Sequence, residues 1–584
     1  MLKEAVYHMM DSNYAYALDI NTLVIRIRTK KKDIKRCILF YGDRCYEKEP
    51  ILMDSVELKV VASDAFFDYF EVEFKTKWKR VCYYFLLDDG KNTLYYYGDE
   101  FHEKLEHQRS KYYQYAYIRE KDIIDVPVWA QDSVMYQIFP DSFATKKGVI
   151  QKQKKTIQLE GGICCESNLG GSLVGVTENL PYIKELGANC IYLTPIFKAI
   201  SFHKYNTIDY YEIDPCFGTK EDFKELVNEC HKLGIRIILD GVFNHTSPYF
   251  FAFKDILDHG EKSKYKDWYL IDSFPVKVSY PPNYEAFAYV KDMPRLNTAN
   301  EEVINYFMEV GKYWIKEFDI DGWRLDVANE IDHDFWVSFR RNIKSVKKDA
   351  LLVAEIWENA QSFLSGDQFD SSMDYNFMNV CEEFFSAGKI SVTEFDQRLA
   401  NLRMRYKKPI QKVLMNLLDS HDVRRFLYTC GGNTEKLKLS SFFQMTYEGM
   451  PSIFYGDEVG LSGVTELEYR RPMEWEKEKQ DKSLLEHYKK LISIRNGHAA
   501  LRRGAYRTEV IDEMKKVYGF TRIYENEKVL VLLNNSEFET EISIAIDSDK
   551  LFFMDLYSNK EISKDETGNI SVVLPAYSGA VIPM

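Results

Sequence analysis

An alternation of short apolar runs with helix-type spacing constrains the fold of residues 123–502 more than any other feature. Each run has about the length of a buried strand, and the segments between runs place apolar residues every three or four positions. The eight runs are 134–140, 189–195, 237–245, 322–326, 351–355, 369–375, 413–422 and 452–458. Strand–helix alternation repeated eight times predicts an α/β fold, the (β/α)₈ TIM barrel.

The ends of two predicted helices are marked by specific residues. Thr219 followed by Asp222 is a variant of the capping box, and Gly234 ends the same helix. An earlier helix begins at Thr177 and stops at Gly187. These signals place two of the helices that separate the strands.

Residues 1–122 follow a different pattern, because strict apolar–polar alternation, as at 56–60 and 70–74, replaces helical spacing. This pattern predicts an N-terminal β-sandwich, with turns at 41–43 and 88–90. The structural alternative is a scaffold domain without a site of its own.

Two further segments complete the predicted organisation. Residues 246–298 carry aromatic, Asp and Pro residues without a long periodic run, which predicts a subdomain inserted after the third strand of the barrel. Short strand patterns return from 503 to 584 and predict a small C-terminal β domain with a structural role.

Composition excludes several classes of partner. The net charge of −13 argues against nucleic acid and anionic membranes. No apolar run reaches about 18 residues, and Met1 leads into no signal-type stretch. The ten Cys residues have no metal-type spacing and fit reduced thiols. We therefore expect a cytoplasmic protein with no membrane or nucleic-acid partner.

The predicted fourth strand carries the clearest chemical signal. Side chains alternate between the two faces of a strand, so Arg324 and Asp326 share one face. The Arg is expected to keep the neighbouring carboxylate ionised. An ionised carboxylate at the carboxyl end of a strand suits the nucleophile of a retaining glycosidase. A buried ion pair that only fixes packing is the structural alternative.

Polar residues also follow other predicted strands at their carboxyl ends, where barrel enzymes place their active sites. They are Asp240, Asn244, His245, Arg324, Asp326, Glu355, His421 and Asp422. Burying so many charged groups for packing alone would cost free energy, so the cluster indicates a catalytic site.

Four of these stretches resemble the signature regions of glycoside hydrolase family 13, the α-amylase family. They are DGVFNH (240–245), GWRLDVANE (322–330), AEIWE (354–358) and LLDSHD (417–422). Three other stretches are similar to the neopullulanase, cyclomaltodextrinase and maltogenic amylase subgroup: MPRLN (293–297), VANE (327–330) and GMPSIFYGDEVG (449–460). Residues 4–33 resemble the N-terminal carbohydrate-binding module of that subgroup.

The resemblance implies roles for individual residues. Asp326 corresponds to the nucleophile, Glu355 to the general acid/base and Asp422 to a third carboxylate that orients the substrate. Tyr205 corresponds to a platform for the sugar, and Glu466 with Arg470 to an Asp/Arg pair that grips sugars further along. The implied substrate-binding residues are Tyr205, Asp240, His245, Arg324, Asn329, Glu330, Trp357, His421, Glu466 and Arg470.

The sequence departs from the family at the segment implied to bind calcium. That segment falls at 144–148, which reads Ala-Thr-Lys-Lys-Gly, and Ser172 replaces an expected Asp. Lysine is unsuited to a calcium site, because calcium takes oxygen ligands. We expect no metal ligand set and no required cofactor. Glu358 also stands where the family has His, which affects substrate preference.

The resemblance therefore implies a retaining α-glucan hydrolase that cleaves α-1,4 bonds of cyclodextrins, pullulan or maltooligosaccharides, with transfer to sugar acceptors as a side reaction. It also implies a homodimer formed through the N-terminal module. The alternatives are an α-glucosidase-type or sucrose-type enzyme on the same barrel, and a non-catalytic carbohydrate-binding relative.

Overall fold

A computed structural model describes residues 1–146, 154–158 and 163–584. The chain forms two compact units. The first contains residues 1–125, 389–411 and 506–521, and the second contains 126–388, 412–505 and 522–584.

The N-terminal part of the first unit is built of antiparallel strands. They are β1 (Ala15–Asp19), β2 (Thr22–Lys30), β3 (Arg36–Asp43), β4 (Met53–Ser63), β5 (Phe67–Lys75), β6 (Val81–Asp88), β7 (Thr93–Tyr97), β8 (Glu100–His102) and β9 (Tyr113–Tyr115). Residues 53–58 of β4 pair with β3 and residues 59–63 pair with β5, and a β-bulge interrupts the second pairing between Val60 and Ala62. One strand therefore joins two sheets, and residues of both enclose a single aromatic core that includes Phe70 and Tyr83.

One of the two predicted turns in this module is wrong. The segment 41–43 belongs to strand β3, and its Gly42 is required by a close approach, because an added Cβ would lie 2.5 Å from the carbonyl oxygen of Leu52. The turn at 88–90 is confirmed, since β6 ends at Asp88 and Gly90 has φ +84°. In the same unit α10 (Val392–Met404) packs against β4.

The second unit contains the eight parallel strands of a barrel. They are β10 (Met135–Ile138), β13 (Cys190–Leu193), β16 (Arg236–Gly241), β17 (Gly322–Leu325), β18 (Leu351–Ala354), β19 (Ser371–Ser372), β20 (Met415–Leu417) and β21 (Met450–Phe454). The order in the sheet is β19-β18-β17-β16-β13-β10-β21-β20. A parallel bridge between Met373 and Met415 brings the two ends together, which confirms the predicted (β/α)₈ fold.

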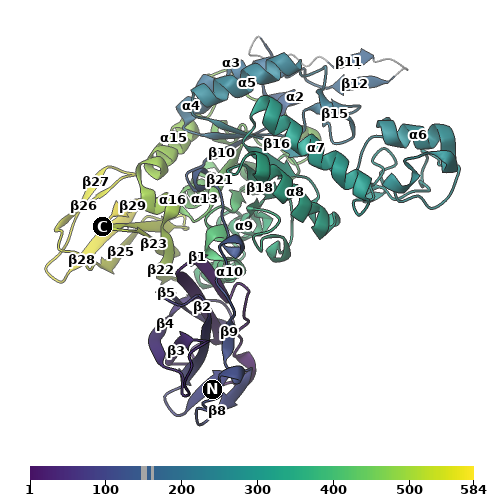
Figure 1. Ribbon diagram of the computed structural model, residues 1–584. Helices are drawn as coiled ribbons and strands as arrows, with labels where there is room; N and C mark the ends of the chain where they lie inside the picture. The colour runs from purple at the N-terminus through teal and green to yellow at the C-terminus, as the bar shows by residue number, and fades with distance from the viewer. Residues whose placement is uncertain (147–153, 159–162) are drawn as a thin grey trace. The chain divides into compact units, whose positions relative to one another are not determined.

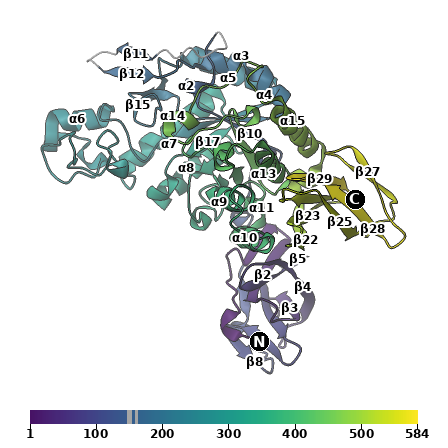
Figure 2. The same cartoon turned by 180° about the vertical axis from the view of Figure 1, so that it is seen from behind.

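Helices separate the strands along the chain, as Figures 1 and 2 show. The principal ones are α3 (Leu173–Glu178), α4 (Leu180–Leu186), α5 (Lys220–Lys232), α7 (Glu301–Phe318), α8 (His333–Val346), α9 (Tyr375–Cys381), α13 (Thr434–Thr446) and α15 (Lys482–Gly497). The predicted capping box of Thr219 and Asp222 opens α5. The helix predicted from Thr177 is divided at Asn179 into α3 and α4, and Gly187 ends it with φ +98°.

Burial on both faces explains why the strands are short apolar runs. Trp323 of β17 is fully buried beside the rings of Phe197, Phe243 and Phe339, outside the sheet. The next residue, Arg324, lies opposite Asp240 in the register of β16 with β17. Residues on this second face therefore point into the barrel, as the alternation predicts.

The segment 246–298 contains α6 (Phe251–His259) and several 3₁₀ turns after strand β16. The C-terminal strands of this unit pair antiparallel: β24 (Glu527–Asn534) with β29 (Ser578–Pro583), β25 (Thr540–Ala545) with β28 (Asn569–Leu574), and β26 (Phe552–Asp555) with β27 (Lys560–Ser563). In the described part of the chain, no helix has the length and apolarity needed to cross a membrane.

Candidate active site

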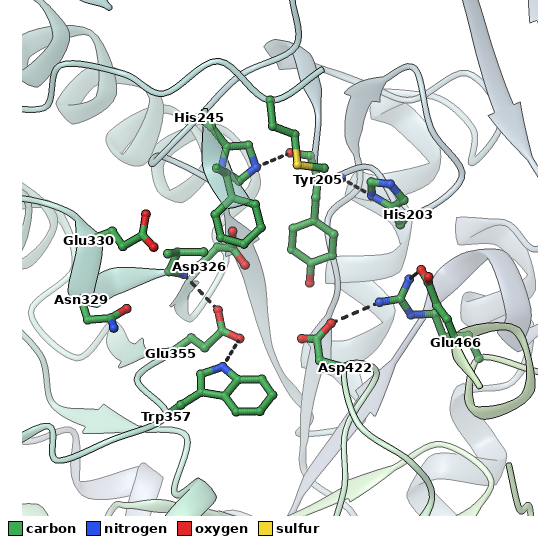
Figure 3. Close-up of a pocket in the computed structure, with 14 residues that line it drawn as sticks. His203, Tyr205, His245, Asp326, Asn329, Glu330, Glu355, Trp357, Asp422 and Glu466 are labelled. Carbon is green, nitrogen blue, oxygen red and sulfur yellow. Dashed lines mark hydrogen bonds and ion pairs between the residues drawn. The ribbon is translucent and has the colours of Figure 1, made fainter. Parts of the chain in front are cut away.

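A pocket of about 470 Å³ lies where the barrel strands end at their carboxyl sides (Figure 3). Residues that the sequence placed at the site line most of it. The lining residues are His203, Tyr205, His245, Phe287, Met293, Asp326, Val327, Asn329, Glu330, Glu355, Trp357, Asp422, Glu466 and Arg470. The predicted residues Asp240, Arg324 and His421 lie behind this surface and are almost completely buried.

Arg324 is the centre of the site. Its Nη1 lies 2.8 Å from Asp240 Oδ1 and 2.8 Å from Asp326 Oδ1, and its Nη2 lies 2.8 Å from Glu355 Oε2. One guanidinium therefore holds carboxylates from three adjacent strands, β16, β17 and β18. Such charge-assisted contacts fix both the position and the orientation of the carboxylates.

The expectation that Arg324 keeps the pKa of Asp326 low is wrong. Burial, together with the nearby Glu355 and Asp240, raises the pKa of Asp326 well above its usual range, and Arg324 only partly opposes this. The physical reason is that one positive charge is shared by three carboxylates. The sequence pattern showed the Arg–Asp pair and could not show that the Arg has two further partners.

The two oxygens of Glu355 have different surroundings. Oε2 forms an ion pair with Arg324 Nη2 and accepts a hydrogen bond from the backbone N–H of Val327 at 3.0 Å. Oε1 accepts a longer hydrogen bond, from Trp357 Nε1 at 3.2 Å. Val327 has φ +46°, a left-handed conformation that is costly for a β-branched residue, and this conformation is part of the turn that aims its N–H at Glu355. Oε1 is therefore the oxygen that can exchange a proton with a bound molecule.

Asp422 lies across the pocket from Glu355 (Figure 3). Two basic side chains, Arg470 and His421, contact its carboxylate. Its Oδ1 accepts a hydrogen bond from Arg470 Nη2 at 3.1 Å, and its Oδ2 lies 3.0 Å from His421 Nε2. Although burial opposes ionisation, His421, Arg324 and Arg470 together lower the pKa of Asp422. Asp422 is thus ionised throughout the neutral range.

Tyr205 and His245 form another wall of the pocket. The Tyr205 hydroxyl donates to Asp240 Oδ2 at 3.0 Å, and the same carboxylate accepts from Tyr192 at 2.6 Å. His245 Nε2 lies 3.0 Å from the carbonyl oxygen of Tyr205, and burial lowers the pKa of His245 to about 4. Its imidazole is therefore neutral at pH 7.

The remaining predicted residues lie around the opening of the pocket. Trp357 stacks on Tyr375 with ring centroids 4.1 Å apart, and 44% of its surface is exposed. Asn329 and Glu330 follow β17 in the turn after Val327. Glu466 pairs with Arg470 one helical turn later, on α14 (Glu466–Tyr469) and the residue after it.

Four lining residues had no role assigned from the sequence: His203, Phe287, Met293 and Val327. His203 accepts the backbone N–H of Tyr205 at 3.1 Å, and Phe287 stacks on His245 with centroids 5.0 Å apart. Met293 begins the motif MPRLN, Val327 begins VANE, and His203 lies two residues before Tyr205, so that signal was present. Phe287 lies in the inserted segment, where no pattern marks it.

The described residues do not fit the calcium site that the family implies. Ser172 caps α3 by accepting the backbone N–H of Gly175, and Asp141 accepts hydrogen bonds from Ser167 and the N–H of Asn168. Among the residues that the structure describes, no group of three His, Cys, Asp or Glu side chains could hold a metal ion. Of the implied segment, 147 and 148 lie outside the described residues.

Comparison with known proteins identifies the family. Residues 137–478 match the profile described as alpha amylase, catalytic domain. This chain is a member of the α-amylase family. Two further profiles match this glycoside hydrolase, the alpha amylase N-terminal ig-like domain over 1–119 and the maltogenic amylase C-terminal domain over 508–581.

The similarity of this α-amylase family member to its relatives extends over the whole chain. It is 43% identical to neopullulanase 2 of Thermoactinomyces vulgaris, over 100% of this chain and 99% of that protein. It is 41% identical to a cyclomaltodextrinase of Geobacillus thermopakistaniensis, over 99% of this chain and 98% of that one. A solved cyclomaltodextrinase structure matches with a TM-score of 0.94 and 36% identity, and 100% of each chain is covered.

Proposed function

We propose that this protein is a retaining hydrolase of α-1,4-glucosidic bonds that acts on cyclodextrins, pullulan and maltooligosaccharides. The observation that carries the proposal is the attachment of Asp326 and Glu355 to the two terminal nitrogens of a single guanidinium. Retaining glycosidases need their two carboxyl groups only about 5–5.5 Å apart, and a shared guanidinium favours that close approach.

The proposed reaction begins with attack of Asp326 on the anomeric carbon, which forms a glycosyl ester. Glu355 donates its proton from Oε1 to the glycosidic oxygen, so that the bond from this oxygen to the anomeric carbon breaks and the leaving sugar departs with a free hydroxyl. Glu355, now ionised, removes a proton from water, and the resulting attack releases the sugar from Asp326. A sugar hydroxyl that replaces water in this second step gives transfer.

The proton balance of the site fits this sequence. Arg324 supplies one positive charge to three carboxylates, and the raised pKa of Asp326 favours a proton within this group. A substrate that seats its glycosidic oxygen beside Glu355 Oε1 favours that proton on Glu355, which leaves Asp326 paired with Arg324 as the nucleophile. The ionised Asp422 stabilises the positive charge that develops on the sugar ring.

Two other functions are less well supported. An α-glucosidase-type or sucrose-type enzyme would share the barrel, but the motifs MPRLN and VANE and the names of the relatives favour glucan hydrolysis. A non-catalytic carbohydrate-binding relative would typically lack one of the three carboxylates, and all three line the pocket.

Product analysis tests the proposal. We expect the purified protein to release maltose or panose-type products from cyclodextrins and pullulan, with slower action on starch, and Glu355→Gln to be inactive in the same assay. Cleavage confined to sucrose or to terminal glucose units would favour the first alternative. Binding of glucans without any release of products would favour the second.

We further propose that the protein works in the cytoplasm as a two-fold homodimer formed through residues 1–122 and needs no metal ion. A relative named intracellular maltogenic amylase, from Bacillus subtilis, is 36% identical over 92% of this chain, which supports the compartment. The exposed aromatic and aliphatic side chains of the module, among them Phe66 and Leu52, support a self-complementary contact.

A further inference from the structure

Gln137 is a buried polar residue at the carboxyl end of β10 that neither the sequence motifs nor the proposed reaction uses. Its side chain is 1% exposed. Its amide Nε2 lies 2.5 Å from Nδ1 of His421, a residue that follows a different barrel strand, β20. This contact joins the first strand of the barrel to the wall of the pocket.

The groups around the other ring nitrogen decide where the proton of His421 lies. Nε2 faces the hydroxyl of Tyr205 and, at 3.0 Å, Oδ2 of Asp422. The Tyr205 hydroxyl donates its own proton to Asp240, so its oxygen can only accept from His421. Asp422 is ionised and can also only accept. Nε2 must therefore carry a hydrogen.

The neighbour of Nδ1, the side-chain amide of Gln137, can donate a hydrogen bond. In a neutral imidazole with its hydrogen on Nε2, Nδ1 is a bare acceptor, and the amide N–H of Gln137 is the donor that satisfies it. The backbone of His421 is fixed separately, because Arg470 Nε donates to its carbonyl oxygen at 2.7 Å. Arg470 thus holds the position of the residue, while Gln137 contacts the ring.

We propose that Gln137 is a positioning residue of this active site, whose amide N–H holds His421 in the Nε2–H tautomer so that the ring presents its proton to Asp422 and Tyr205. The proposal rests on the assignment of Asp422 to the glucan-cleaving site, and it predicts that changes at 137 act on turnover through His421.

Two substitutions of similar size separate this role from simple packing. Gln137→Met removes the donor and should lower kcat about ten-fold with a smaller change in KM, since one hydrogen bond is lost. Gln137→Glu replaces the donor by a carboxylate that accepts a hydrogen bond from Nδ1–H. In this variant Nε2 keeps its hydrogen only while the ring is doubly protonated, so kcat should fall as the pH rises.

The other charged or titratable groups around the His421 ring are the same in the wild type, Gln137→Met and Gln137→Glu. They are Tyr205, Asp240, Asp422 and Arg470. Burial raises the pKa of Tyr205 well above its usual range, so Tyr205 stays protonated. Because Asp240 titrates in the wild type as well, its effect cancels when pH profiles are compared. An alkaline fall that is specific to Gln137→Glu therefore reports on His421.

The decisive experiment combines pH profiles of kcat with nitrogen NMR of ¹⁵N-histidine-labelled full-length protein, in which the His421 signal is identified by its loss in His421→Asn. We expect a neutral ring with its proton on Nε2 in the wild type, and an alkaline fall in kcat for Gln137→Glu alone. A proton on Nδ1 in the wild type, or a profile of Gln137→Glu parallel to that of the wild type, would overturn the proposal. Wild-type protein that cleaves no glucan would refute the proposed function instead, and the NMR measurement would still report the tautomer.

Discussion

At the scale of single residues, the account depends on the carboxylates that Arg324 brings together. Substituting Glu355 by Gln keeps its size and removes its proton, so kcat on a cyclodextrin should fall about 10²–10⁴-fold. Asp326→Asn should be at least as inactive, and the double variant should lose little more, because groups that act as a unit are not additive. Steady-state kinetics of the three variants check this.

A matched control for these variants is Glu330→Gln, another carboxylate in the same pocket but outside the guanidinium network. Its effect should appear mainly in KM and stay below about ten-fold, in line with the loss of one hydrogen bond to a sugar. If Glu330→Gln were as inactive as Glu355→Gln, the assignment of the acid would be mistaken.

The calcium prediction also belongs to this scale, since it depends on Ser172 and the lysine-containing segment. We expect a chelator to leave the melting temperature and the activity unchanged, because Ser172 is engaged in capping α3. Differential scanning calorimetry with and without chelator measures this. A drop in melting temperature that added calcium reverses would reveal a metal site that the described residues do not contain.

At the scale of elements, a buried ion network surrounds Asp321, just before β17 and at the opposite end of this strand from the active site. Asp321 is buried and accepts from Arg236 at 2.7 Å, His231 at 2.9 Å and the N–H of Ile237 at 3.0 Å, with Lys347 at 3.0 Å. These partners outweigh burial and lower the pKa of Asp321. A carboxylate with a lowered pKa stabilises the fold above its unfolded-state pKa, and this contribution is lost as the pH falls towards the folded value.

We therefore predict that Asp321→Asn destabilises the protein by about 3–5 kcal/mol at pH 7, as expected when one partner of a buried ion network is removed. The difference from wild type should shrink at acid pH, where the wild-type carboxyl also becomes protonated. Asp319→Asn is the matched control, since 66% of its side chain is exposed beside Lys347, and it should cost less than about 1 kcal/mol. Denaturant unfolding at two pH values measures both.

Element prediction from the sequence succeeded where local signals were strong. The alternation gave all eight barrel strands, and the capping box placed the start of α5. It failed where tertiary contacts decide. The predicted strand 369–375 retains only Ser371–Ser372 as β19, and the segment 41–43 is strand because Gly42 meets a neighbouring chain. The proton balance at Arg324 and the contact of Gln137 with His421 depend on residues far apart in sequence, so no local pattern could show them.

At the scale of the whole molecule, the first prediction concerns assembly. Sedimentation of the full-length chain should give a dimer at micromolar concentration, and a single monomeric species would refute the proposed interface. Deletion of 1–122 should give a monomer or a poorly soluble protein. In the same unit α10 packs against β4, and Arg26, which is bound to Glu71, donates to the carbonyl oxygen of Met404. Deletion of 1–122 exposes the surface of α10 that packs against β4.

The same deletion distinguishes two roles of the module. If it narrows access to the pocket of a partner subunit, the truncated protein should gain activity on starch relative to cyclodextrin. If it only tethers the enzyme to polysaccharide, the ratio of starch to cyclodextrin activity should fall. Initial rates on the two substrates provide the ratio.

The central claim is that Asp326 forms a covalent intermediate while Glu355 handles the proton, so that the configuration of the cleaved bond is kept. Proton NMR of a cyclodextrin digest, recorded before the products mutarotate, tests this most directly. The account predicts that the newly formed reducing end appears first as the α-anomer and only later equilibrates. Initial release of the β-anomer would show inversion and would contradict the roles assigned to both carboxylates.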